Sequence, residues 1–273
     1  MTDHYCVMGN PIAHSKSPRI HTLFAAQCGQ DLDYRAILVE PGHFARAVAD
    51  FHAQGGKGLN VTVPFKEEAW ALVATRSARA QRAGAVNTLQ LDPSGSYYGD
   101  NTDGVGLVRD LKNNQNCALA GKCVLLLGAG GAARGVIEPL LDEQPSLLLI
   151  ANRTPGKAVQ LARDFHDSGR IEGCGLEALA ERSFDVIINA TAAGLRDEVP
   201  ILPPGVVQTH SWCYDMMYAD EPTAFMRWAQ NRGAERTLDG LGMLVEQAAE
   251  AFYLWRGVRP ATKPVIQSLR QRR

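Results

Sequence analysis

The chain has 273 residues, 45% of them hydrophobic, which allows one large domain or two of ordinary size with buried cores. Its formal net charge of −1 gives no global attraction to nucleic acid or to an anionic membrane. No apolar run has the length of a transmembrane helix, and the N-terminus lacks a signal-peptide pattern. The six cysteines and seven histidines show no metal-ligand spacing, so we expect a reduced, cytoplasmic protein without a metal site.

The first hundred residues alternate strand and helix patterns. We expect strands over 5–8, 34–39 and 59–63, helices over 18–28, 44–51 and 66–72, and a hairpin of strands 83–89 and 96–99. Within 59–63, Leu59, Val61 and Val63 alternate with Asn60 and Thr62. This alternation predicts a strand with one apolar and one polar face.

Two serines precede the first expected helix, which Pro18 opens. Proline favours an extended conformation for Ser17, and Ser15 and Ser17 would then point the same way. Two hydroxyls beside a helix N-terminus form a reasonable cradle for a carboxylate. The alternative is that Ser17 is only the N-cap of the helix.

Lys66 falls in the first turn of an expected helix, where the macrodipole prefers negative charge. The dipole favours the neutral amine and any nearby carboxylate the ammonium, so Lys66 is a candidate proton donor and acceptor. The alternative is a surface lysine balanced by Glu67 and Glu68. Asp103 precedes a helix expected over 105–112 and could be only its N-cap. We place the main domain boundary near Asp103.

A glycine-rich turn follows the strand expected over 123–127. Gly128 allows a tight turn, Gly130 lets backbone N–H groups approach a pyrophosphate, and Ala133 fills the third small position of G-x-G-x-x-G/A. A helix through Leu141 follows, and its N-terminal amides and dipole favour a phosphate. The pattern predicts a dinucleotide-binding turn.

The residues at the end of the next strand, 146–151, indicate which dinucleotide the turn would bind. An NAD-binding unit usually carries Asp or Glu there to bind the ribose 2′-hydroxyl. Here Asn152, Arg153 and Thr154 stand in that place, with Lys157 just beyond. A guanidinium and an ammonium attract a 2′-phosphate, so we expect NADP rather than NAD. The alternative is a solvated basic turn.

The remaining elements complete an α/β pattern. A strand over 184–189 runs into polar residues that include Thr191, a strand and its exit loop cover 212–218, and a helix covers 222–232. An amphipathic helix over 239–255 has Gln247 at the edge of its apolar stripe, as a rim residue or a ligand contact. A short helix follows from about Lys263.

Seven motifs stand in a fixed order at residues 9–18, 60–66, 83–88, 99–104, 128–132, 152–154 and 239–243. With them the chain resembles the shikimate dehydrogenase family from the first strand to the last helix. The resemblance implies reversible, NADP-linked reduction of 3-dehydroshikimate to shikimate, a step toward chorismate and the aromatic amino acids. It implies an N-terminal α/β substrate domain and a Rossmann-like, doubly wound NADP-binding domain, with the substrate between them. The C-terminal helices would return to the first domain, which gives residues 1–103 with 240–273 and residues 104–239.

The resemblance also implies roles for individual residues. Lys66 is similar to the family's acid/base group and Asp103 to its partner. The residues implied in substrate binding are Ser15, Ser17, Thr62, Lys66, Asn87, Asp103, Tyr218 and Gln247. Those implied in cofactor binding are Gly128, Ala129, Gly130, Gly131, Ala132, Asn152, Arg153, Thr154, Lys157, Thr191, Met216, Gly240 and Met243. The partner would be a small-molecule substrate, not nucleic acid or a membrane, and the chain a monomer or a homodimer.

Three departures from the family pattern are visible. Lys157 stands where the family often has Arg, Ala192 and Ala193 where it often has Ser, and the spacing over 218–223 is unusual. Two alternatives remain open. One is a quinate/shikimate dehydrogenase with relaxed cofactor use, and the other is a non-catalytic NADP-binding regulatory module.

Overall fold

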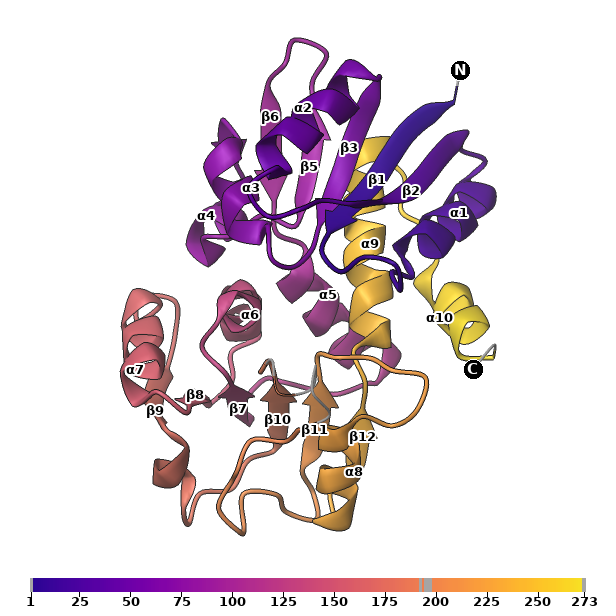
Figure 1. Ribbon diagram of the computed structural model, residues 1–273. Helices are drawn as coiled ribbons and strands as arrows, with labels where there is room; N and C mark the ends of the chain where they lie inside the picture. Colours follow the sequence, from indigo (N-terminus) through magenta and orange to yellow (C-terminus); the bar gives the residue numbers. More distant parts are fainter. Residues whose placement is uncertain (1, 192, 194–197, 272–273) are drawn as a thin grey trace. The chain divides into compact units, whose positions relative to one another are not determined.

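The computed structural model describes residues 2–191, 193 and 198–271 (Figure 1). The chain divides into two compact units, Met1–Gly106 with Val245–Arg273, and Leu107–Leu244. Both changes of unit fall inside helices, α5 (Asp103–Arg109) and α9 (Leu241–Arg256). The expected boundaries, after residues 103 and 239, lie nearer the N-terminus in both cases.

The first unit is built on a six-stranded mixed sheet in the order β2-β1-β3-β5-β6-β4. Its strands are β1 (Asp3–Gly9), β2 (Leu32–Leu38), β3 (Gly56–Val61), β4 (Thr75–Arg76), β5 (Thr88–Leu91) and β6 (Tyr97–Asp100). β1 pairs in parallel with β2 and β3, whereas β5 runs antiparallel to both β3 and β6. The ends of β1, β3 and β6 and the start of β5 therefore lie along one edge.

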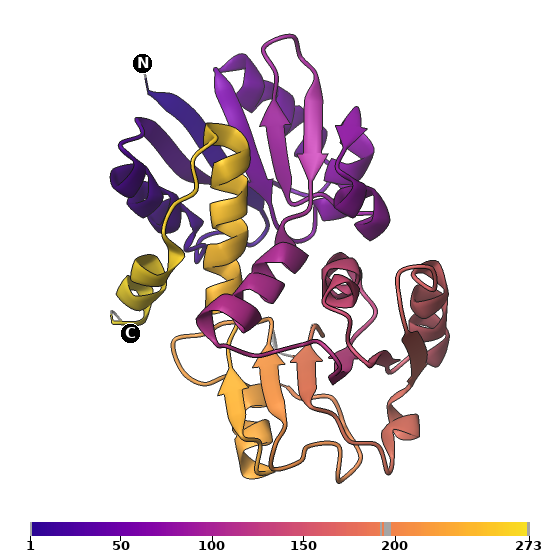
Figure 2. The same cartoon turned by 180° about the vertical axis from the view of Figure 1, so that it is seen from behind.

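Helices cover both faces of this sheet. They are α1 (Ser17–Cys28), α2 (Phe44–Ala53), α3 (Lys66–Leu72), α4 (Ala78–Ala83), α9 and α10 (Thr262–Arg270). α2 and α3 lie on one face and α9 on the other (Figures 1 and 2). Phe44 stacks on Phe65 at 5.2 Å between ring centroids, and Phe24 of α1 contacts Phe252 of α9 at 5.7 Å. β3 is consequently buried on both faces.

Three expectations for this unit are wrong in part. β3 ends at Val61, and Val63, expected on the apolar face, is 54% exposed because the chain turns after the strand. Asn60, expected on a polar face, is only 5% exposed because helices cover both sides of the sheet. The strand expected over 83–89 begins at Thr88, since α4 occupies the residues up to Ala83 and ends at Gly84, which has φ +61°.

The second unit contains a sheet in the order β12-β11-β10-β7-β8-β9, in which every pairing is parallel. Its strands are β7 (Cys123–Leu127), β8 (Leu147–Asn152), β9 (Ile171–Gly175), β10 (Val186–Asn189), β11 (Trp212–Asp215) and β12 (Arg236–Leu238). This is the doubly wound order of a dinucleotide-binding fold, with its switch point between β7 and β10. The expected α/β class, a substrate domain plus a Rossmann-like domain, is confirmed.

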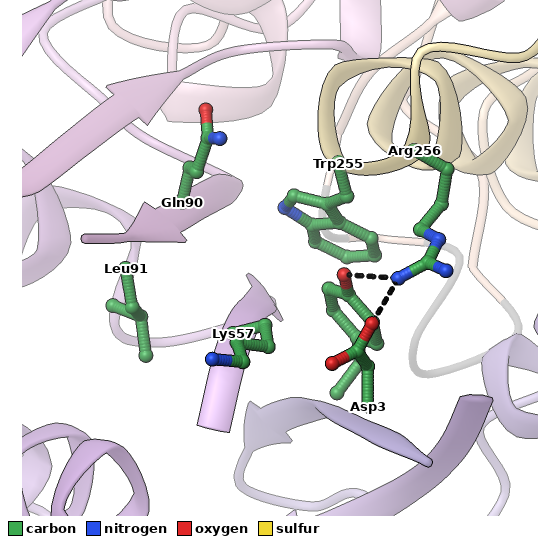
Figure 3. Close-up of a pocket in the computed structure, with 7 residues that line it drawn as sticks. Asp3, Lys57, Gln90, Leu91, Trp255 and Arg256 are labelled. Atoms are coloured by element: carbon green, nitrogen blue, oxygen red, sulfur yellow. Dashed lines mark hydrogen bonds and ion pairs between the residues drawn. The ribbon is translucent and has the colours of Figure 1, made fainter. Parts of the chain in front are cut away.

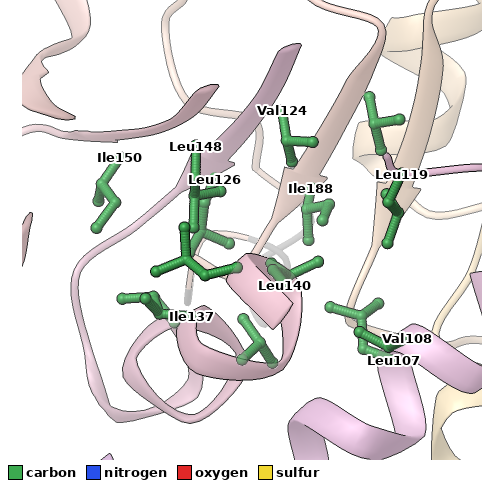
Figure 4. Packing of buried hydrophobic residues seen from close by; sticks show 14 of the residues in the cluster. Leu107, Val108, Leu119, Val124, Leu126, Ile137, Leu140, Leu148, Ile150 and Ile188 are labelled. Atoms are coloured by element: carbon green, nitrogen blue, oxygen red, sulfur yellow. The ribbon is translucent and has the colours of Figure 1, made fainter. Parts of the chain in front are cut away.

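Helices α6 (Gly131–Asp142), α7 (Pro155–Asp164) and α8 (Ala224–Asn231) complete this unit, and a π-helical turn (Asp110–Asn114) continues α5. Ile137 and Leu140 of α6 pack against Leu126 of β7 and Ile188 of β10 (Figure 4). All four are at most 1% exposed, so the core supports the strands on both sides of the switch point. Among the described residues, no helix combines the length and apolar character needed to cross a membrane.

Candidate active site

The edge of the first sheet where β1, β3 and β6 end brings together polar residues that are far apart in sequence. Ser15 follows β1, Thr62 and Lys66 follow β3, Asn87 precedes β5, and Asp103 follows β6. Gly9 allows the first two segments to approach each other, because a Cβ there would come within 3.0 Å of the Thr62 methyl group. The motif at 9–18 is thereby held beside the motif at 60–66.

Lys66 and Asp103 form an ion pair at this edge. Lys66 is the first residue of α3, and its Nζ donates to Asp103 Oδ2 at 2.6 Å across 37 residues of chain. The side chains are 24% and 11% exposed, so the pair is largely shielded but reachable. Glu67 and Glu68, the alternative partners for Lys66, are exposed. Asp103 is the first residue of α5, and Lys66 and Asn87 occupy its carboxylate, so the N-cap interpretation is not supported.

Asn87 and Gln247 lie against the same carboxylate. Asn87 Nδ2 donates to Asp103 Oδ1 at 2.8 Å and is 3.0 Å from Thr102 Oγ1. Gln247 Oε1 lies 3.3 Å from Asn87 Nδ2 and 3.2 Å from Thr102 Oγ1. Sequence reasoning missed Thr102, which is fully buried, although a polar residue between the end of β6 and Asp103 is a signal. The cluster presents an ammonium, a carboxylate and two amides, a set suited to a ligand with several hydroxyl groups.

The serine pair differs from expectation in its local conformation. Lys16, not Ser17, is the N-cap of α1, and its φ of −84° and ψ of −6° are helical rather than extended. Ser17 is the first residue of α1 and Pro18 the second, so Ser17 lies in the first turn of the helix and not in the extended segment expected before the proline. The Ser17 N–H donates to Ser15 Oγ at 3.3 Å. The two serines thus remain adjacent, with Ser17 6% exposed and Ser15 half-buried.

The glycine turn of the second unit lies at the switch point of its sheet. Gly128 has φ +108°, and a Cβ there would lie 3.0 Å from the Ala190 carbonyl oxygen after β10. Gly130 is the N-cap of α6, and a Cβ there would meet no atom within 4 Å. The amides of Gly131 and Ala132 follow in the first turn, where N–H groups have no intrahelical acceptor. These features fit the pyrophosphate of a dinucleotide.

The basic turn after β8 carries two exposed cations, Arg153 and Lys157. The Asn152 side chain donates to the Thr154 carbonyl at 3.1 Å, which shapes the turn before α7. Arg153 and Lys157 are exposed, and in the described part of the chain neither side chain has an ion pair or a hydrogen bond. The sequence of this turn, residues 152–157, contains no Asp or Glu that would repel a 2′-phosphate. The turn therefore fits NADP better than NAD.

Buried polar residues support the ends of β10 and β11. Thr191 Oγ1 donates to Asn189 Oδ1 at 2.7 Å, and Asn189 Nδ2 donates to Asp215 Oδ1 at 3.1 Å. Burial raises the pKa of Asp215, against hydrogen bonds from Thr223 and the Met217 amide. Sequence reasoning missed Asn189 and Asp215, whose signal is a polar residue at the end of each buried strand.

The motif at 239–243 is fixed by close packing. A Cβ on Gly240 would come within 3.0 Å of the Met216 carbonyl, and one on Gly242 within 3.0 Å of the Asp110 carboxylate. The Met243 amide donates to the Tyr214 hydroxyl at 3.3 Å. Met216, Gly240 and Met243 are therefore neighbours within the second unit.

Other expected residues have less defined surroundings. Tyr218 belongs to the second unit and is half-buried, which raises the pKa of its hydroxyl. Ala192 lies outside the described residues, and the Ala193 carbonyl accepts a hydrogen bond from the Glu198 amide at 3.1 Å. In the described part of the chain, no group of three or more His, Cys, Asp or Glu side chains is arranged to hold a metal ion.

A separate pocket lies at the opposite edge of the first sheet (Figure 3). Its lining includes Asp3 and Lys57 near the starts of β1 and β3, with Leu91 at the end of β5. Arg256 bridges Asp3 and the Tyr5 hydroxyl there. None of the expected site residues lines this pocket.

Three family models match the chain. They describe a shikimate dehydrogenase substrate binding domain at residues 7–89, a shikimate/quinate 5-dehydrogenase at 110–206, and a shikimate 5′-dehydrogenase C-terminal domain at 240–270. A shikimate dehydrogenase (NADP(+)) of Nitrosococcus oceani is 60% identical over 99% of this chain and 96% of its own length.

Solved structures of similar fold and sequence agree with these family matches. The Ael1 enzyme of Pseudomonas putida is 46% identical with a TM-score of 0.93, covering 98% of both chains. The shikimate 5-dehydrogenase of Thermus thermophilus, solved with NADP(H) and shikimate, is 33% identical with a TM-score of 0.88, covering 99% of both chains. The chain therefore belongs to the shikimate dehydrogenase family.

Proposed function

We propose that the chain catalyses the reversible, NADP-linked reduction of 3-dehydroshikimate to shikimate, with Lys66 and Asp103 as its acid/base pair. As a member of this family the chain is an NADP-dependent oxidoreductase acting on a CH–OH group. The observation that carries the proposal is the 2.6 Å contact between Lys66 Nζ and Asp103 Oδ2, beside the amides of Asn87 and Gln247. A non-catalytic NADP-binding module would leave this arrangement unexplained.

Lys66 exchanges the proton in this mechanism. Bound NADPH supplies the hydride for the ketone carbon, and the Lys66 ammonium donates a proton to the ketone oxygen. In the reverse direction the amine accepts that proton from the substrate hydroxyl. Asp103 Oδ2 holds the ammonium, while its Oδ1 is held by Asn87 Nδ2, so the carboxylate cannot turn freely away from Lys66.

The remaining polar groups recognise the substrate. Ser15 and Ser17 bind its carboxylate, and Thr62, Asn87 and Gln247 bind its hydroxyl groups, with Tyr218 near the ring. Such a site rejects analogues that lack a hydroxyl, because a buried polar group would then lose its partner.

The second unit holds the cofactor. Its pyrophosphate would lie against the turn and first helical residues, Gly128, Ala129, Gly130, Gly131 and Ala132. The 2′-phosphate would meet Asn152, Arg153, Thr154 and Lys157, and the nicotinamide would meet Thr191, Met216, Gly240 and Met243. In this assignment the first unit, residues 1–106 with 245–273, is the substrate domain and the second unit, residues 107–244, is the NADP-binding domain, in a cytoplasmic monomer or homodimer.

The test follows reduced nicotinamide by absorbance with shikimate and NADP. We expect turnover in the wild type, and Lys66→Ala to lose most of it while shikimate affinity stays within roughly tenfold. Lys57→Ala, an exposed lysine at the opposite sheet edge, is the matched control and should retain activity. Near-normal turnover in Lys66→Ala would remove Lys66 from the mechanism. Rates on quinate and with NAD distinguish the quinate/shikimate alternative.

A further inference from the structure

We propose that the Tyr34 and Thr88 hydroxyls are positioning groups for the acid/base pair, acting through a buried chain of hydrogen bonds that ends at Asp103. The inference rests on the proposed roles of Lys66 and Asp103. The chain of side chains is Tyr34, Asn60, Thr88, Asn87 and Asp103, all within the first unit. Tyr34, Asn60, Thr88 and Asn87 are between 0 and 6% exposed, so the chain is shielded from water as far as Asn87.

The direction of each hydrogen bond is determined by its neighbours. The Tyr34 hydroxyl donates to Asn60 Oδ1 at 2.7 Å, which leaves Asn60 Nδ2 to face the other way. That amide nitrogen donates to the Asn87 carbonyl at 3.3 Å and to Thr88 Oγ1 at 3.0 Å. A carbonyl can only accept, so the orientation of the Asn60 amide is fixed at both ends.

Thr88 passes this orientation to Asn87. Because Thr88 Oγ1 accepts from Asn60, its single proton is free to donate to Asn87 Oδ1, 2.9 Å away. The Thr102 amide donates to the same oxygen at 2.9 Å. With two donors on its oxygen, Asn87 must present Nδ2 to Asp103 Oδ1, and this leaves Asp103 Oδ2 for Lys66. The buried hydroxyls thus hold the carboxylate in the orientation that the proton transfer requires.

Matched substitutions separate the hydroxyl from the packing. Thr88→Val keeps the shape of the side chain and removes the hydroxyl, whereas Thr88→Ser keeps the hydroxyl and removes the methyl group. We expect Thr88→Val to lower kcat about tenfold, the effect of one lost buried hydrogen bond, with KM for shikimate within threefold. Thr88→Ser should retain kcat within about twofold, a pattern opposite to that expected if Thr88 only fills space.

Tyr34→Phe removes the hydroxyl at the far end of the series of hydrogen bonds that leads to Asp103. Its matched control is Tyr5→Phe, since Tyr5 lies in the same apolar cluster and its hydroxyl contacts Arg256 instead. We expect kcat to fall about fivefold to tenfold in Tyr34→Phe and to stay unchanged in Tyr5→Phe. Burial raises the pKa of the Tyr34 hydroxyl, and a hydrogen bond with the Ser17 side chain opposes this rise. Because Ser17 is a proposed substrate-binding residue, the comparison of kcat with KM is taken from the Thr88 variants. The double variant Tyr34→Phe/Thr88→Val should lose less than the product of the two single losses, because both interrupt one chain.

Three outcomes overturn the inference or its foundation. In the first, the wild type is active and Lys66→Ala is inactive, but Thr88→Val and Tyr34→Phe keep full kcat. This result refutes the positioning role and leaves the proposed function intact. Equal losses in Thr88→Val and Thr88→Ser assign the effect to packing and also refute it. No turnover in the wild type refutes the proposed function itself. If Thr88→Val does not fold, Tyr34→Phe against Tyr5→Phe decides.

Discussion

Replacing Asp103 by Asn tests the centre of the proposed site with almost no change of shape. Both carboxylate oxygens accept hydrogen bonds, Oδ2 from Lys66 and Oδ1 from Asn87. An asparagine has one acceptor and one donor end, so in either orientation its NH₂ group must face one of these two donors. The substitution therefore removes the negative charge and introduces a donor–donor contact.

The expected loss of kcat/KM in Asp103→Asn follows from these two hydrogen bonds. A hydrogen bond to a charged group contributes about 1.5–3 kcal/mol, and the low exposure of both side chains preserves that value. A loss of about 3 kcal/mol in the transition state corresponds to a fall of roughly 100-fold in kcat/KM. Because Asp103 also holds Asn87, we expect KM for shikimate to rise as well as kcat to fall.

The assay is the initial rate of NADPH formation at varied shikimate, together with NADP binding and the midpoint of thermal unfolding. Asp50→Asn is the control, since Asp50 pairs with Arg46 at 3.6 Å on the exposed surface of α2. We expect that control to keep wild-type kinetics. A folded Asp103→Asn variant that keeps kcat/KM within threefold of wild type would refute the assignment of the pair.

Three further predictions concern other parts of the chain. Arg153→Asp should weaken NADP binding far more than NAD binding, because a carboxylate repels the 2′-phosphate; equal loss of both in titrations would reject the assignment. Gly130→Ala should keep the wild-type melting temperature, since its methyl group meets no protein atom within 4 Å, yet should weaken NADP binding; an unchanged Kd would separate this glycine from the pyrophosphate site. Burial lowers the pKa of His21 from 6.5 to about 3 in the folded protein. The folding stability that depends on neutral His21 is therefore complete above about pH 6.5. It is lost as the pH falls toward 3, by up to about 1.4 kcal/mol per pH unit. His21→Phe should flatten this loss in urea unfolding between pH 6 and 4, and an unchanged slope would show that His21 is not its source.

Much of the fold could be predicted from local signals. The turn from β7 into α6 follows from Gly128, Gly130 and the apolar strand before them, and these residues lie within a few positions of one another. By contrast, no helix was expected over 78–83, although Ser77 gives a local N-cap signal there. Ser77 caps that helix by accepting from the Ala80 amide, and the same hydroxyl donates to Asp100 at 2.5 Å, 23 residues away. No local pattern contains that partner.

The candidate site shows the same division. Sequence spacing alone left Lys66 as a possible surface lysine and Asp103 as a possible N-cap, and only the resemblance to a family joined them. The sheet order supplies the physical reason for their contact, because β3 and β6 run in the same direction and end at one edge. That order depends on the antiparallel β5 between them, which no spacing in the sequence specifies.

Asn60 shows why buried polar residues were the hardest part to predict. Alternation with Leu59 and Val61 indicated a polar face, and that inference assumes that one side of the strand meets solvent or ligand. Here both sides are covered, so the amide must find partners inside the protein or cost about 1–3 kcal/mol for each unpaired group. Its partners are Thr88 of the adjacent strand β5 and Tyr34 of β2, which β1 separates from β3, and both are 26 or more residues away in the sequence. A polar residue in a strand buried on both faces is therefore a sign of a network, and the far end of that network identifies the groups it orients.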